Sequence, residues 1–168
     1  AIKAIGQIAR EGDLDQGLDL YSGAVNEEVR IAAAEAITTL CRHAAPSEAR
    51  STSRASIYTL APTSLTRATA LDIFRKLGDN VLLPLVISAC EDPDSVVREA
   101  GITALSGWPN PTPLQEVYAL AKAGDTEDQR ALALDGYIRM LRLPSDQSET
   151  DKLAGFKAAI ELAYGRPD

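Results

Sequence analysis

The feature that most constrains the fold of this chain is a fourfold repeat centred on arginine. The four copies align on Arg30, Arg67, Arg98 and Arg130, at separations of 37, 31 and 32 residues. Four positions before each arginine stands a residue whose side chain can cap the start of a helix: Asn26, Thr63, Asp94 and Thr126. Self-similarity at such a period indicates a repeat protein, in which each unit buries its apolar face against the next one.

The residues that follow each arginine keep the period of an α-helix. The third residue is small, the fourth is apolar and the seventh is large and apolar in every copy, as in Gly101, Ile102 and Leu105. This spacing predicts an amphipathic helix in each copy. The small residue indicates that a neighbouring helix approaches closely. The tenth position holds Leu40, Leu77, Trp108 and Met140, so we interpret Trp108 as a core residue and not as an exposed recognition aromatic.

The remaining segments predict a partner helix for each copy, and we expect an all-α fold without strands. Helices are predicted at 14–22, 26–42, 48–60, 63–77, 81–91, 94–107, 113–123, 126–143 and 149–164, and residues 1–10 resemble the end of another, which makes about ten. Asn80 is the predicted cap of the helix at 81–91. The last helix is predicted to be apolar on the side of Leu153, Phe156, Ala159, Ile160 and Ala163. Helices paired and stacked in this way predict a right-handed α-α superhelix, an α-solenoid.

We expect residues 1–168 to form a single repeat domain. Its units are predicted at about 1–10, 13–42, 47–77, 80–108, 111–143 and 147–164, where the first and last are half units. Because both ends divide a unit, the sequence is expected to be a fragment of a longer protein.

The third copy carries a family resemblance. DPDSVVREAGITAL, residues 92–105, resembles the second half of a HEAT repeat in its Asp-Pro turn, Asp cap, Val-Arg pair and Ala-x-x-Ala-Leu ending. NEEVRIAAAEAI and TEDQRALALDGYI are similar to it, and the part from 77 to 164 resembles HEAT-like arrays of large bacterial multi-domain proteins. The resemblance implies a HEAT- or armadillo-like scaffold without a shared chemistry. It also implies that the aligned arginines, with an Asp near the turn, form hydrogen bonds between neighbouring repeats.

Composition narrows the classes of function. The net charge of −7, from 17 basic and 24 acidic residues, argues against nucleic-acid binding, which usually needs a basic excess. No apolar run is long enough to cross a bilayer, so we expect no membrane insertion. Cys41 and Cys90 are interpreted as buried thiols, and His43 is the only histidine. We predict no catalytic, cofactor or metal site; cytoplasmic and periplasmic locations both remain open.

The leading functional hypothesis is a non-enzymatic scaffold for protein–protein interaction. The fifth residue after each arginine is polar, and two of the acids there have a basic residue four positions later, an order that favours exposed pairs on a helix. The predicted partner-binding residues are Glu35, Asp72, Lys76, Thr103, Asp135 and Arg139. One alternative is a HEAT-fold enzyme such as a DNA-base glycosylase or a bilin lyase. Salt-sensitive binding of duplex DNA would support the glycosylase. Another is a passive spacer between domains. The partner's identity and the oligomeric state remain open.

Overall fold

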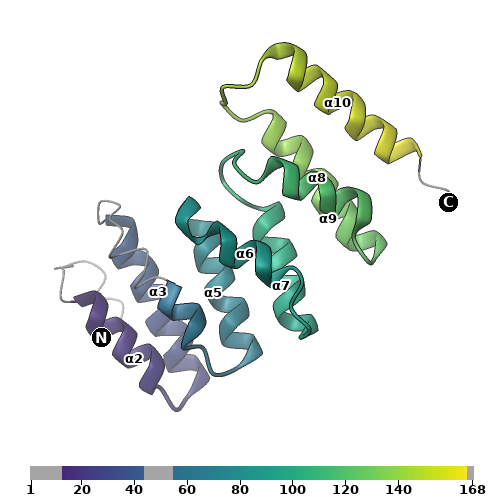
Figure 1. Ribbon diagram of the computed structural model, residues 1–168. Coiled ribbons are helices and arrows are strands. Elements are labelled where there is room, and N and C mark those ends of the chain that lie inside the picture. The colour runs from purple at the N-terminus through teal and green to yellow at the C-terminus, as the bar shows by residue number, and fades with distance from the viewer. Residues whose placement is uncertain (1–12, 44–54, 166–168) are drawn as a thin grey trace.

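The computed structural model describes residues 13–43 and 55–165, and within these ranges the chain is helical without strands (Figure 1). The helices are α2 (Asp13–Gly23), α3 (Glu27–His43), α5 (Ser64–Leu77), the 3-10 helix η1 (Asn80–Leu82), α6 (Leu83–Ala89), α7 (Ser95–Ser106), α8 (Leu114–Ala123), α9 (Glu127–Leu141) and α10 (Glu149–Tyr164). Residues 55–59 are also helical. The predicted all-α class is therefore confirmed. The half unit at 1–10 and the start of the helix predicted at 48–60 lie outside the described residues.

The aligned helices begin at the residues that the sequence predicts. Thr63 and Thr126 form capping boxes at the starts of α5 and α9, and the Asp94 carboxylate accepts from two backbone N–H groups of α7. Asn26 accepts in the same way from the N–H of Glu28. Each side chain satisfies backbone donors that the first turn of a helix leaves free.

The predicted cap at Asn80 is wrong. Asp79 caps η1 instead, because its carboxylate accepts from the N–H of Val81. The Asn80 side chain is occupied elsewhere, where its amide oxygen accepts from the indole N–H of Trp108 at 3.1 Å. Trp108 is fully buried, which confirms its interpretation as a core residue.

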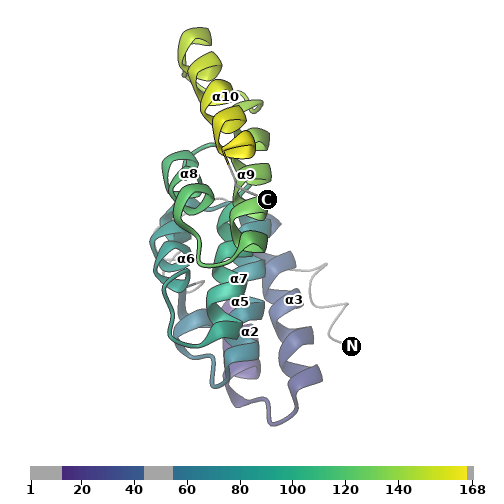
Figure 2. The same ribbon diagram turned by 90° about the vertical axis from the view of Figure 1, so that its right-hand side faces the viewer.

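The four aligned arginines lie on α3, α5, α7 and α9, and each of these helices packs against the next. In addition α2 pairs with α3, α6 with α7, and α8 with α9. Figure 2 shows α3, α5, α7 and α9 following one another along the molecule, with α6 and α8 beside them. We call α3, α5, α7 and α9 the second helices, because each follows its partner in the chain.

The predicted columns form the core between the helices. The third, fourth and seventh residues after each arginine are buried in all four copies: Ala33, Ala34, Ile37, Ala70, Leu71, Phe74, Gly101, Ile102, Leu105, Ala133, Leu134 and Tyr137. At Gly101, the small residue after the arginine allows the close approach of a neighbouring helix that we expected. An added Cβ there would lie 2.7 Å from the carbonyl carbon of Ala89 in α6. Real Cβ atoms do not approach backbone so closely, so this position requires glycine.

Three of the arginines close the turn of their own unit. Each donates a hydrogen bond to the carbonyl oxygen six residues earlier, between the two helices that it joins: Arg30 to Ala24, Arg98 to Asp92 and Arg130 to Gly124. The bonds of Arg98 and Arg130 all stay within their own unit, so the expectation that the whole column bonds between neighbouring repeats is wrong for these two. These carbonyls lie in the turn that follows the preceding helix, where they lack helical partners, and the long side chain reaches them within the unit.

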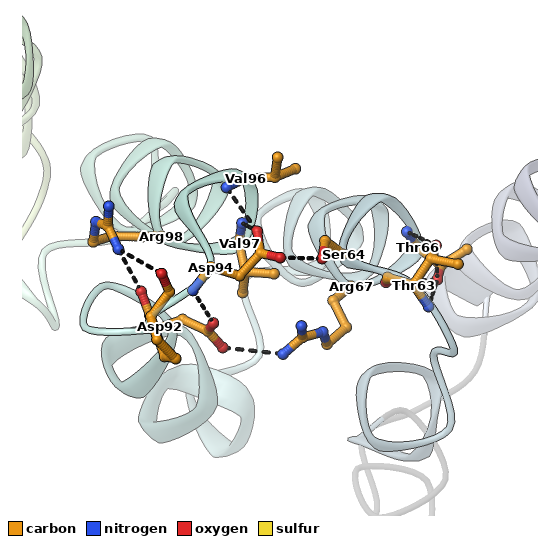
Figure 3. A network of polar contacts seen from close by, with 10 residues as sticks. Thr63, Ser64, Thr66, Arg67, Asp92, Asp94, Val96, Val97 and Arg98 are labelled. Carbon is orange, nitrogen blue, oxygen red and sulfur yellow. Dashed lines mark hydrogen bonds and ion pairs between the residues drawn. The ribbon is translucent and has the colours of Figure 1, made fainter.

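Arg67 bonds in the predicted way, to the next unit (Figure 3). Its guanidinium lies 3.1 Å from the carboxylate of Asp92, in the turn before α7. Beside this ion pair, the hydroxyl of Ser64 in α5 donates to the carboxylate of Asp94, the cap of α7. The start of α5 is thus tied to the start of α7 by two side-chain bridges.

Helix α10 is less covered than its sequence predicts. Only Gly155 and Ala159 are buried, whereas Leu153 and Ile160 are 55% and 57% exposed. The predicted apolar side is therefore only partly packed, against α9. Among the described helices, none has the length and apolar character that crossing a bilayer requires.

Candidate functional site

The predicted partner-binding residues lie on the second helices, on a surface that we call the second-helix face. Glu35 on α3, Thr103 on α7 and Asp135 on α9 are exposed. Asp72 and Lys76 on α5 are about half exposed. The sixth residue, Arg139 on α9, lies partly buried against α7. Five of the six side chains are thus accessible on this face.

Asp72 is held by two cations of its own helix. Its carboxylate lies 2.6 Å from the ammonium of Lys76, which confirms the predicted pair, and 2.6 Å from the guanidinium of Arg75, a second partner that was not predicted. Partial burial acts to raise the pKa of Asp72, but hydrogen bonds from Lys76 and Arg75 outweigh it and hold this pKa below its ordinary value. The negative charge of Asp72 is therefore compensated within α5.

The predicted pair between Asp135 and Arg139 is wrong. The Arg139 guanidinium donates instead to the carbonyl oxygens of Ser106 and Trp108, at 3.1 and 2.6 Å. These carbonyls lie at the end of α7, where backbone acceptors lack helical partners and the dipole favours a cation. Burial, followed by the nearby charge of Arg75, lowers the pKa of Arg139. Arg139 consequently links α9 to α7 and leaves Asp135 exposed.

A groove runs between α5 and α7 on the second-helix face. It has a volume of about 200 Å³ and is lined by Ala68, Asp72, Arg75, Glu99, Ala100, Thr103 and Ala104. Two of the predicted residues, Asp72 and Thr103, are therefore brought together across it. The other lining residues, among them Arg75 and Glu99, were not predicted from the sequence. The sequence feature that could have indicated the groove is the pair of small side chains at 68 and 100, which leave space between two helices.

A second hollow of about 370 Å³ lies where α8 and α9 meet α10. Its lining is Ala121, Lys122, Glu127, Arg130, Glu161, Leu162 and Gly165. Arg130 and Glu127 form an ion pair at 2.8 Å, and Arg130 also closes the turn before α9. Two of the four charged side chains of this hollow, Arg130 and Glu127, thus already have structural roles.

Reactive side chains are not gathered at either hollow. The thiol of Cys90 donates to the carbonyl of Val86 at 3.3 Å, and burial, aided by the charge of Glu91, raises the pKa of Cys90 to about 12. It is therefore a poor nucleophile near neutral pH. The side chains of Cys41 and His43 lie outside the described part of the chain. Within that part, no three His, Cys, Asp or Glu side chains gather as metal ligands would.

Comparison with protein-family models, with curated proteins and with solved structures finds no match to this chain. The functional inference therefore rests on the arrangement of the second helices and on the groups that they expose.

Proposed function

We propose that this chain is a HEAT-like α-solenoid that works as a non-enzymatic scaffold for protein–protein interaction. The observation that carries the proposal is the unbroken succession of α3, α5, α7 and α9, each of which packs against the next. Helices in such a row offer one extended surface to a partner. The hypothesis that the chain is built of repeats is supported by a shared hydrogen bond, which closes a turn at the same offset of six residues for Arg30, Arg98 and Arg130.

The binding surface in this proposal is the second-helix face. Exposed acids stand on its two outer helices, Glu35 on α3 and Asp135 on α9, and the groove opens between the two central ones. Side chains that are exposed and not committed to the fold are the ones that a partner can contact at low cost. By this criterion Glu35, Thr103 and Asp135 are the strongest of the predicted residues, and Arg139 is a structural residue.

The test is a comparison of partners captured by the wild-type chain and by a face variant. Glu35→Lys combined with Asp135→Lys reverses two exposed charges on the second-helix face and leaves the compensated Asp72 in place. A matched control, Glu91→Lys combined with Glu116→Lys, reverses two exposed charges near α6 and on α8. Circular dichroism melting establishes that all three proteins fold.

We expect quantitative mass spectrometry of pulldowns from the source cells to show partners that the face variant loses and the control variant keeps. Charge reversal replaces attraction by repulsion in the encounter with a partner, so the loss should be larger at low salt. If the wild type and the face variant capture the same proteins in the same amounts, the second-helix face is not the binding surface.

A further inference from the structure

The groove between α5 and α7 has an apolar floor. The side chains that form it are three methyl groups, those of Ala68 on α5 and of Ala100 and Ala104 on α7. Ala104 is almost fully buried, whereas Ala68 and Ala100 are partly accessible. A volume of about 200 Å³ above such a floor accepts one long side chain and not a cofactor or a folded domain.

The two sides of the groove differ in charge compensation. On the α5 side, Asp72 is paired with two cations, Arg75 and Lys76, so this side does not attract a further cation. On the α7 side, the Glu99 carboxylate accepts a hydrogen bond at 2.7 Å from the amide of Gln129, which is a neutral donor. Within the described part of the chain, no cation lies within ion-pair distance of Glu99. Glu99 therefore keeps an uncompensated negative charge at the edge of an apolar floor.

We propose that this groove receives an arginine or lysine side chain from an extended basic segment of the protein partner. The alkyl stem would lie on the three alanines and the cation would meet Glu99, with the Thr103 hydroxyl beside it. Long basic side chains bury their stems on apolar surface while the charged end stays hydrated, which is the division that this groove presents. The inference rests on the proposed function, because it names the chemistry of the partner for the same face.

The surroundings of the groove fit a segment with several basic residues. Glu35 lies on α3, on one side of α5 and α7, and Asp135 lies on α9, on the other side. A chain that crosses the second helices would meet an exposed acid before and after the groove. The net charge of −7 would also attract a basic partner over longer distances.

The direct test uses short labelled peptides and the intact chain. One peptide alternates arginine and serine, a second alternates leucine and serine, and a third alternates glutamate and serine. We expect the arginine peptide alone to bind in fluorescence anisotropy, with an affinity that falls as salt is raised. In ¹⁵N-resolved NMR titrations, the amide shifts should concentrate on the groove residues of α5 and α7.

Two variants separate shape from charge. Ala100→Leu fills the groove with the residue that α9 carries at the aligned position, Leu132, and should weaken the arginine peptide about tenfold or more. Glu99→Gln keeps an acceptor for Gln129, removes the charge and should weaken it roughly threefold, as expected for one partly exposed ion pair. The matched controls are Ala119→Leu and Glu116→Gln on α8, which should leave the affinity unchanged. If Ala100→Leu fails to fold, Glu99→Gln still tests the charge.

Three results would overturn the inference. The first is preferential binding of the leucine peptide, which would make the occupant apolar. The second is preferential binding of the glutamate peptide, and the third is binding of the arginine peptide that Glu99→Gln and Ala100→Leu leave unchanged. The proposed function fails differently, when the Glu35 and Asp135 reversals leave native partners bound. If those reversals abolish capture but no arginine peptide enters the groove, the scaffold proposal stands and this inference is wrong.

Discussion

The two junctions on either side of α7 are built from the same aligned positions and are closed in different ways. Between α7 and α9, Gly136 lies against the backbone carbonyl of Ser106, and a Cβ at this position would clash with it. Arg139 then bonds the end of α7. Between α5 and α7, the position aligned with Gly136 is Ala104, which keeps its methyl group and lines the groove. There the side-chain bridges join the helix starts, through Arg67 and Asp92 and through Ser64 and Asp94.

One sequence pattern thus permits both a tight and an open junction between helices. A glycine lets two helix backbones meet, which leaves little surface for a partner. Alanines at the junction of α5 and α7 leave a hollow, and charged bridges at its end hold the helices in place. The tight junction is closed at a glycine, and the open one carries the groove that the proposed binding would use.

The largest effect is expected where one residue serves both junctions. The Trp108 side chain bonds Asn80 after α5, and its carbonyl accepts from Arg139 of α9. Trp108→Ala should lower the free energy of unfolding by about 3–5 kcal/mol, because it leaves a large cavity in the core. Urea unfolding measures this loss, and Leu153→Ala on the exposed side of α10 is the control with a small effect. A small loss at Trp108 would mean that the junctions do not share a core.

Gly136→Ala should break the tight junction selectively. The clash of the added methyl with Ser106 should outweigh the better helix propensity of alanine and destabilise by about 1–3 kcal/mol. Gly23→Ala is the matched control, since an added Cβ there meets no atom within 4 Å. Unfolding midpoints compare the two, and equal midpoints would show that α9 can move away from α7 without cost.

The stability that side-chain links give to the two junctions can be compared by replacing Arg139, between α7 and α9, and Arg67, between α5 and α7. Arg139→Met removes two hydrogen bonds to carbonyls at the end of α7 and should cost about 1–2 kcal/mol. Arg67→Met removes an ion pair whose arginine is 31% exposed and should cost about 0.5–1 kcal/mol. Chemical denaturation of both variants gives the order, and a larger loss at Arg67 would reverse the assignment of the tight and open junctions.

The smallest effect concerns acid. A hydrogen bond from Ser64, opposed by some burial and aided by the N–H groups of Val96 and Val97, lowers the pKa of Asp94. A carboxyl with a lowered folded-state pKa adds stability above its unfolded pKa of about 4, and this stability is lost as pH falls through the folded value. Asp94→Asn should therefore flatten the dependence of the unfolding midpoint on pH below about 4. Thr126, the cap of α9, carries no charge and should not make the unfolding midpoint depend on pH. Thr126→Ser is therefore the control.

The sequence was sufficient for features that depend on neighbours along the chain. The caps at Thr63, Asp94 and Thr126 and the buried columns follow from helix geometry, which a few consecutive residues determine. The all-α class follows from the same periodicity. The cap at Asn80 was predicted wrongly because Asp and Asn are both good cap residues. The side chain of Asn80 bonds Trp108, 28 residues away, and a contact at that distance is not visible in the local sequence.

The candidate site was predictable only in part, because its geometry depends on pairs of helices. Exposure of Glu35, Thr103 and Asp135 followed from the helix period. The inward turn of Arg139 did not, since a long side chain reaches both Asp135 and the end of α7 and the sequence does not rank the two. The groove was missed because it needs Ala68 and Ala100 to face each other across two helices. On α10, Leu153, Ile160 and Ala163 of the predicted apolar side are exposed, because burial of that side depends on neighbouring helices and not on the periodicity of the sequence.

The hydrogen bond from three of the aligned arginines to their own turn has a consequence for the order of assembly. A bond that spans six residues can form as soon as a helix pair has left the ribosome, without waiting for later parts of the chain. Arg67 instead needs Asp92, 25 residues further on. The pair of α8 and α9 should accordingly close its own turn early, whereas the start of α5 should be fixed only after α7 has been made.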